Sequence, residues 1–516
     1  MSAAMPALGA PLSKRQLYTV FAGIMTGLGL AALDTNIIGV ALPTIVGDLG
    51  GLNHIAWVGT AYLLTSTAAT PLFGKLSDLY GRRMLFQVAI VTFVVGSLLC
   101  GISQTMMQLV LARGLQGIGG GGLFAMAFTI IGDVVPPRER GRYVGFITSV
   151  FAAASVAGPL LGGFFVDQLD WRWIFFINVP LGIVALLVTS SALRLPFARR
   201  EAKVDYVGAG LLVTSVTMLI LMATWAGEGT YGWTSPVTLA MGGGSLLVAA
   251  LFVVWEQRVE EPIVPMRLFG NEVVRVVVPM MVVLGSMMFG ASAFMPVFLQ
   301  AVDGVSATQS GLLLLPLMLG VTISSISTGR ITAITGRYKV WPILGTGLAL
   351  LGTMLLTQLE ADTSRWYTSL GLLCIGLGFG MVMPTSTLAV QNAVEWRDLG
   401  VASSLVTFFR SLGGAVGLAV YGAVFNASIT SSGVDERLLQ APGQIQELPP
   451  AVGQPVIDAL AEAVQRIWVF AVPVMAVGFV LSWFVKELPL RDTSPMQRST
   501  ADTGADASAS ASALAH

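Results

Sequence analysis

Residues 276–299 read VVVPMMVVLGSMMFGASAFMPVFL, a run of 24 residues without a charged side chain. A helix of that length exceeds the roughly 30 Å hydrocarbon core of a bilayer. The rest of the chain has the same character, since 54% of the 516 residues are hydrophobic and 11% are charged, against about 25% charged in soluble domains. Backbone groups in lipid must be satisfied internally, and runs this long favour helices over the short strands of a barrel. We therefore predict an all-α integral membrane protein.

Apolar runs between charged or turn-rich breaks predict about fourteen transmembrane helices, grouped as six, two and six. The predicted spans are Tyr18–Ile45, Ile55–Gly74, Leu85–Ser103, Met106–Ile131, Tyr143–Val166 and Trp173–Leu193, then Val207–Ala226 and Val237–Trp255, then Val276–Leu299, Gln309–Gly329, Val340–Leu359, Tyr367–Gln391, Val401–Ala427 and Ile467–Val485.

These spans divide the chain into five parts. We expect a cytoplasmic N-terminal segment (1–17), an N-terminal six-helix bundle (18–193), a linker with two inserted transmembrane helices (194–272), a C-terminal six-helix bundle (273–485) and a disordered cytoplasmic tail (486–516). The C-terminal bundle includes a long outer loop (428–465) with a short helix near 456–464.

The basic residues test this map independently, because Lys and Arg collect in cytoplasmic loops. With the N-terminus inside, 22 of the 28 basic residues fall in cytoplasmic segments, 4 fall in outer loops and 2 lie within spans. An odd number of spans would break this alternation. Both termini are therefore expected in the cytoplasm.

Several function classes are excluded by what the sequence lacks. Two cysteines far apart and two histidines make a metal site very improbable, and no GxxxxGK[ST] loop for ATP occurs. The glycines at 117–122 satisfy GxGxxG, but no strand precedes them and they lie in an apolar span, so the dinucleotide interpretation fails. No nucleophile and base pattern or basic nucleic-acid patch occurs. We expect neither an enzyme nor a cofactor.

Three ionisable residues lie inside spans: Asp34, Arg113 and Arg410. A charge in the bilayer costs at least about 2.5–3.5 kcal/mol, so a functional role is the default hypothesis. Asp34 is the only carboxylate well inside a span, and a carboxylate poised between desolvation and a nearby guanidinium can bind and release a proton. Asp34 lies about 16 Å, and Arg113 about 10 Å, from the outer ends of their spans, so their depths permit a pair. The alternative is that Asp34 caps a helix break or pairs permanently with arginine.

Arg410 leaves two interpretations open, contact with a substrate or pairing with backbone carbonyls. Polar and flexible residues elsewhere in the spans are further candidates for a substrate path, although packing against lipid or other helices explains any one of them equally well. These candidates are Asn36, Gln116, Asn178, Met288, Phe289 and Met381.

A weak internal repeat relates the two bundles. Gly74, six residues, Gly81 and Arg82 after the second span are echoed by Gly329, six residues, Gly336 and Arg337 after the tenth. The first of these segments also holds Asp78 and Arg83. Its charges either latch neighbouring helices in one conformation or simply set the topology.

The fifth predicted span contains a helix breaker among small residues: Gly158, Pro159, Gly162 and Gly163. This composition suits a kinked, closely packed helix at a moving interface, or a kink with no moving role.

Together these segments resemble the major facilitator superfamily, and in particular its fourteen-span drug:proton antiporters. The resemblance rests on Gly74 to Arg83, on the span-one stretch Leu33 to Pro43, on Arg113 to Gly121, on Gly158-Pro159 with Gly162-Gly163, and on Trp171 to Pro180. It implies that Asp34 is the protonation site, Arg113 its electrostatic partner, the Asp78 segment a latch and the Gly158-Pro159 region a barrier to leak. Relatives that export divalent cations tend to carry extra acids in the second half, whereas the ninth to fourteenth predicted spans of this chain contain none, which argues against dicationic substrates.

We therefore expect a bacterial inner-membrane exporter that uses the proton gradient to expel small amphipathic compounds by alternating access, as in multidrug efflux and antibiotic resistance. It is expected to act as a monomer in the lipid bilayer. The rival functions are a dedicated exporter of a lipid, siderophore or self-made antibiotic, and a membrane sensor that does not transport. The fold alone does not fix the substrate.

Overall fold

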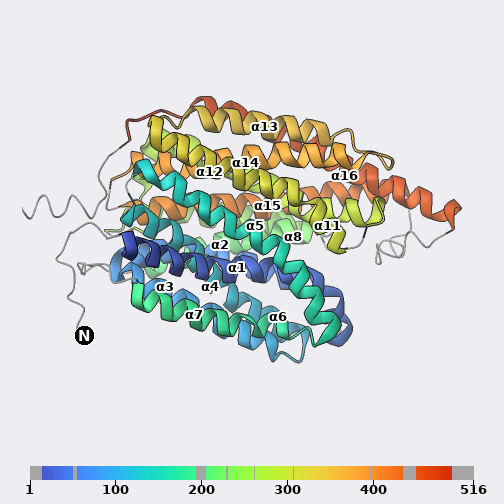
Figure 1. The fold of residues 1–516 in the computed structure, drawn as a ribbon, viewed down its shortest axis with the longest axis horizontal. Coiled ribbons are helices and arrows are strands. Elements are labelled where there is room, and N and C mark those ends of the chain that lie inside the picture. Colours follow the sequence, from blue (N-terminus) through green and yellow to red (C-terminus); the bar gives the residue numbers. More distant parts are fainter. Residues whose placement is uncertain are drawn as a thin grey trace, which may run out of the picture.

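The computed structural model describes residues 14–49, 55–135, 137–192, 205–227, 231–260, 262–305, 307–395, 398–433 and 449–490. Long helices run side by side along the length of the molecule (Figure 1), and no strand occurs in these ranges. The all-helical fold predicted from the apolar runs is therefore confirmed.

The helices of the first half and the insert are α1 (Lys14–Leu49), α2 (Ile55–Tyr80), α3 (Arg82–Gly101), α4 (Met106–Val134), α5 (Pro137–Gln168), α6 (Trp173–Phe176), α7 (Asn178–Ala192), α8 (Tyr206–Gly227) and α9 (Pro236–Glu256). The second half contains the short 3₁₀ helix η2 (Met266–Gly270), the short π-helix η3 (Phe298–Val302) and the α-helices α10 (Glu272–Val297), α11 (Ala307–Leu313), α12 (Leu315–Thr335), α13 (Val340–Leu356), α14 (Arg365–Ala393), α15 (Leu399–Ser432) and α16 (Pro450–Trp483).

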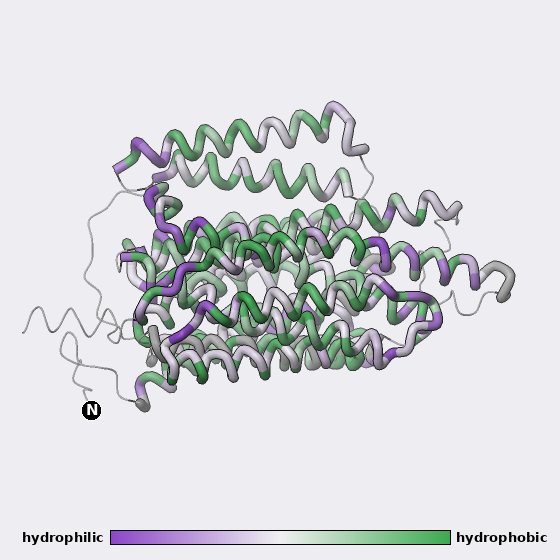
Figure 2. The backbone as a smooth tube through the Cα atoms, turned by 90° about the horizontal axis from the view of Figure 1, so that it is seen from above, coloured by the Kyte–Doolittle hydropathy of each residue, from purple (hydrophilic) through white to green (hydrophobic). Residues whose placement is uncertain are grey.

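Each predicted span falls on one helix or on two consecutive ones. The sixth is divided between α6 and α7, and the tenth between α11 and α12, where Pro316 lies in the first turn of the second helix. By length and composition, eleven of the described helices can cross a membrane. Apolar residues dominate the middle of the helices and hydrophilic ones gather toward their ends (Figure 2), as expected for a bilayer slab.

The helices form two bundles with separate apolar cores. In the first half α1 packs on α5 and α7, and α4 packs on α2 and α3; in the second, α14 packs on α12 and α13, and α15 packs on α10 and α16. The bundles meet along two seams, α5 with α12 and α2 with α15. Helix α8 of the insert lies against both α2 and α15, and α9 packs mainly on α8. The insert therefore covers one of the two seams.

One end of the molecule carries the turn at Arg82 and the turn at Arg337, and we call it the basic end. The bundles touch tightly there. A Cβ on Gly74 of α2 would collide with Ser404 of α15, and the Gln391 side chain of α14 donates to the carbonyl of Phe128 in α4 at 3.3 Å. The described conformation is therefore closed at the basic end.

Two sequence predictions about the C-terminal region are wrong. Residues 428–465 are not mainly a loop, because α15 runs to Ser432 and α16 begins at Pro450, well before the predicted span. The early part of α16 escaped the apolar-run criterion because it is amphipathic, with Val456, Leu460 and Val464 buried on one face. Residues 434–448 lie outside the described part.

The predicted disordered tail also begins too early. The Tyr338 hydroxyl donates to the carbonyl of Lys486 at 3.0 Å and accepts the N–H of Leu488 at 2.8 Å, and Asn392 donates to the carbonyl of Pro489 at 3.0 Å. These bonds hold residues 486–490 on the C-terminal bundle, whereas the predicted tail from 491 onward lies outside the described residues.

Candidate functional site

The Asp34 carboxylate lies inside the N-terminal bundle with both oxygens bonded. Its Oδ2 accepts from Arg113 at 2.6 Å, and its Oδ1 accepts from Gln116 at 2.8 Å and from Asn178 at 2.9 Å. Asp34 is 1% exposed, Arg113 2%, and Gln116 and Asn178 0%. Helices α1, α4 and α7 thus meet at one buried, formally neutral ion pair.

A second layer holds these donors in place. Arg113 also donates to the Gln116 side-chain oxygen at 2.7 Å and to the carbonyl of Val58 at 3.3 Å, and its guanidinium lies 4.4 Å from the centre of the Tyr62 ring. On the other side, Asn178 donates to Ser97, whose hydroxyl donates to the carbonyl of Phe175, both at 2.9 Å. We call Asp34, Arg113, Gln116, Asn178 and Ser97 the Asp34 network.

Glycines bring the helices of this network together. A Cβ on Gly117 of α4 would collide with Thr65 and with the carbonyl of Tyr62 in α2, and a Cβ on Gly96 of α3 would collide with the backbone of Gln116. Only glycine permits such close backbone approach between transmembrane helices. The glycine-rich stretch after Arg113 therefore fixes the place of Arg113 and Gln116 beside Asp34.

The charge balance of the network depends on whether Asp34 is ionised. A charged carboxylate with three donors is compatible with a dry site, because each bond to it is charge-assisted. Protonation would neutralise Asp34 and leave the Arg113 guanidinium buried without its counter-charge, a costly arrangement.

Of the residues predicted from sequence, the structure places Asp34 and Arg113 in contact and adds two that we assigned to a substrate path, Gln116 and Asn178. Asn36 is not part of the network, since its amide donates to the carbonyl of Ala32 on its own helix at 2.7 Å. Sequence reasoning missed Ser97, because a serine in an apolar span carries no signal of its own.

The segment from Gly74 to Arg83 is not a loop, because α2 continues to Tyr80 and α3 begins at Arg82. Gly81, with φ of 92°, makes the turn, and Gly336 (φ 71°) ends α12 at the corresponding place, as the repeat predicts. The Arg82 Nε atom bonds Asp133 at the end of α4 at 2.7 Å, and Arg82 also donates to Ser77. Arg83 donates to the carbonyl of Ser190 at 2.8 Å. The Asp78 side chain lies outside the described part.

Sequence reasoning missed Asp133, the acid that pairs with Arg82 of this segment. An acid near the end of a span looks like an ordinary boundary residue, so nothing marked it. The pair joins α3 to α4 at the basic end.

On α5, Gly158 lies directly against α1, since a Cβ there would collide with Asn36. Gly162 is buried, and a Cβ on Gly163 would meet nothing within 4 Å. The Pro159 side chain lies outside the described part, while the helix continues past it. Gly158 therefore allows α1 and α5 to pack closely at Asn36, which lies two residues after Asp34.

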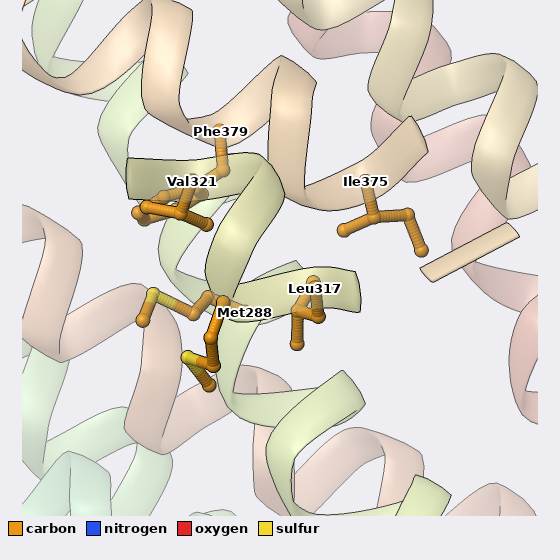
Figure 3. A pocket seen from close by; sticks show the side chains of 6 residues that line it. Met288, Leu317, Val321, Ile375 and Phe379 are labelled. Carbon is orange, nitrogen blue, oxygen red and sulfur yellow. The ribbon is translucent and has the colours of Figure 1, made fainter. Parts of the chain in front are cut away.

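In the C-terminal bundle, Met288 lines an apolar cavity between α10, α12 and α14 with Leu317, Met318, Val321, Ile375 and Phe379 (Figure 3). Phe289 faces Gly414 of α15, and Met381 faces Gly345 of α13. The guanidinium of Arg410 contacts the sulfur of Met383 at 3.4 Å. Within the described residues, no group of acids, histidines and cysteines could hold a metal.

Two apolar helical bundles, an insert across one seam and a buried ion pair in one bundle define a multi-pass membrane transporter. The Major Facilitator Superfamily profile matches residues 24–418. The chain belongs to this superfamily and is a transporter rather than an enzyme.

Individual relatives agree with the family profile. The chain is 39% identical over 499 residues to an uncharacterized MFS-type transporter of Mycobacterium tuberculosis, covering 95% of this chain and 72% of that one. It is 39% identical over 419 residues to the multidrug transporter protein MdtP of Bacillus subtilis, covering 80% and 76%. Among solved structures, the human organic anion transporter MFSD10 superposes with a TM-score of 0.63 at 15% identity, covering 90% and 99%, and supports the fold alone.

Proposed function

We propose that this transporter is a proton-coupled exporter, an antiporter that expels small amphipathic organic compounds. It belongs in this proposal to the fourteen-span multidrug efflux type and works as a monomer in the bacterial plasma membrane. The excess of basic residues at one end supports placing that end, and both termini, in the cytoplasm. The relatives named for multidrug transport support the substrate class.

The Asp34 network is the observation that carries the proposal. Asp34 is the only acid well inside a span, and its partners come from helices that are far apart in the sequence. An ion pair that only stabilises the fold does not need to be the only acid inside the spans. A residue that carries a proton must lie where both its charged and its neutral form can occur. In the proposed cycle, a proton entering from outside neutralises Asp34 and loosens α1 from α4 and α7.

The basic end supplies the gate in this cycle. With Gly74 against Ser404 and Gln391 bonded to the Phe128 carbonyl, the described state is closed toward the proposed cytoplasm. The Arg82–Asp133 pair ties α3 to α4 in the same region. Protonation of Asp34 would shift α4, and with it the end that carries Asp133, so that the bundles separate there and admit substrate.

The test uses purified protein in liposomes that enclose a pH-sensitive dye. A pH gradient is imposed, and a panel of anionic, neutral and cationic amphiphiles is added one at a time. Substrate-dependent proton movement is expected in wild type. It should fall at least about tenfold in Asp34→Asn, which cannot ionise.

Asp48→Asn is the matched control, because Asp48 lies on the same helix, is half exposed and bonds Arg172 at 3.0 Å. This variant should keep proton movement. If Asp34→Asn moves protons as wild type does, the coupling assigned to Asp34 is wrong.

A further inference from the structure

Arg410 places a guanidinium near the middle of the membrane. It lies eleven residues after Leu399, the first residue of α15, or about 16 Å from the basic end. Its neighbour Met383 lies ten residues before Ala393, the end of α14, or about 15 Å from the same end. The positions of Arg410 on α15 and of Met383 on α14 thus give the same depth for the guanidinium.

The partners of Arg410 do not neutralise it. Among the residues that the structure describes, its guanidinium has one bonding neighbour, the Met383 sulfur, which is a weak acceptor. The C-terminal spans contain no Asp or Glu in 273–302, 307–335, 340–359, 365–394, 399–432 or 467–485, and the Asp34 oxygens are already occupied. A rearrangement of those spans alone therefore cannot bring a carboxylate to Arg410, which leaves room for a counter-charge supplied by a bound molecule.

Arg410 also lies at the boundary between the two bundles. Met383 packs against the apolar cores of both bundles. At the same level, a Cβ on Gly285 of α10 would collide with the Arg410 carbonyl, so the backbone beneath the guanidinium is held firmly. The side chain itself is only partly buried. A fixed cation with some open surface at this boundary can meet a transported molecule.

A small apolar cavity lies about one helical turn from Met383 along α14. Phe379, which lines it, is four residues before Met383 and on the same side of α14, and Met288, which also lines it, is three residues after Gly285 on α10. Figure 3 shows Met288 and Leu317 facing this cavity together with Val321, Ile375 and Phe379. The apolar side chains around this small cavity therefore lie about one helical turn from Met383, the residue that contacts the guanidinium.

We propose that Arg410 and the apolar side chains near it on α10 and α14, among them Met288 and Phe379, form a substrate site for amphipathic organic anions, with the carboxylate on Arg410 and the apolar body against those side chains. This deepens the proposed export function and rests on it. An inside-negative membrane potential drives an anion outward, so such a substrate leaves with the electrical force rather than against it. An arginine keeps its positive charge, so it can serve as the counter-charge of a carboxylate.

The test compares three fluorescent carboxylic acids with their primary amides, beginning with 11-(dansylamino)undecanoic acid. Binding to purified protein and outward flux from liposomes are both measured. Wild type should bind the acid about tenfold more tightly than the amide, and Arg410→Met should bring the pair within about twofold, as expected for loss of one charge-assisted contact. Arg410→Lys should keep most of the preference.

The proposal is overturned if none of the three acids binds more tightly than its amide, or if the preference survives in Arg410→Met. Asp34→Asn separates this result from the proton hypothesis. That variant should lose proton-driven flux of acid and amide alike while keeping the binding preference. If flux in Asp34→Asn is still driven by the proton gradient, the proposed role of Asp34 in antiport is contradicted, but the anion site at Arg410 is not.

Discussion

Two arginines lie inside the membrane, one in each bundle, and their surroundings are opposite. Arg113 donates to Asp34, Gln116 and the Val58 carbonyl, whereas Arg410 contacts only the Met383 sulfur among the described residues. The bundles share a repeated turn, at Gly81 and at Gly336, yet differ in this electrostatic design. The fully hydrogen-bonded Arg113–Asp34 pair suits a switch that works within one bundle. The Arg410 guanidinium, which has no carboxylate partner among the described residues, suits a site that binds an anion from outside the chain.

The largest expected difference is in stability. Arg113→Met removes the partner of a buried carboxylate and should lower the free energy of unfolding by about 3–5 kcal/mol. Arg410→Met removes a cation without a partner and should change it by no more than about 1 kcal/mol, or stabilise the protein. Thermal unfolding of both variants in the same detergent measures this. Equal losses would mean that Arg410 has a partner that we have not identified.

The Asp34 and Arg113 substitutions should also be strongly coupled. Asp34→Asn in the Arg113→Met background removes the stranded charge, so the double variant should be more stable than Arg113→Met alone, with a coupling of about 1–3 kcal/mol. A double-mutant cycle of thermal unfolding measures the coupling. Asp34→Asn with Arg410→Met is the control cycle and should be additive within about 0.5 kcal/mol. Additivity in the first cycle would argue against a functional ion pair.

Lysine substitutions should show whether each site needs the planar guanidinium of arginine or only its positive charge. Arg113 bonds three groups in different directions, so Arg113→Lys should lose at least about tenfold in proton-driven flux, since an ammonium cannot reproduce the fork. Arg410→Lys should lose no more than about threefold in flux of a carboxylate dye, since one cation remains in place. The same liposome assay measures both. A severe loss in Arg410→Lys would show that this site, too, depends on the fork.

The smallest expected effects are those of the second members of each site. Asn178→Ala removes one of two donors to Asp34 Oδ1 and should cost about 1 kcal/mol of stability, because the Gln116 bond remains. Met383→Leu beside Arg410 should cost less than about 1.5 kcal/mol, as for other swaps that conserve volume. Thermal unfolding again measures both. If Met383→Leu proves the costlier change, the thioether contact matters more to the C-terminal bundle than proposed.

The apolar runs were long enough to predict the helices, and the isolated charges marked Asp34, Arg113 and Arg410 as exceptional. The repeat predicted equivalent turns, and Gly81 and Gly336 both have positive φ. The Gly74 to Arg83 segment shows the limit of this reasoning. Charged residues ended the predicted span early, although α2 continues as helix to Tyr80.

What the sequence by itself determined is the membrane location, the helical class and the depth of each embedded charge, because hydrocarbon thickness and backbone hydrogen bonding constrain any chain of this composition. Only the tertiary structure decided which charge has a partner. Gln116 and Asn178 donate to Asp34, and Ser97 accepts from Asn178, through contacts between residues up to 144 positions apart. Arg410 has no comparable set of partners in the described chain. Periodicity along one helix gives the depth of a residue but not which neighbouring helix it faces, and partner choice depends on that packing.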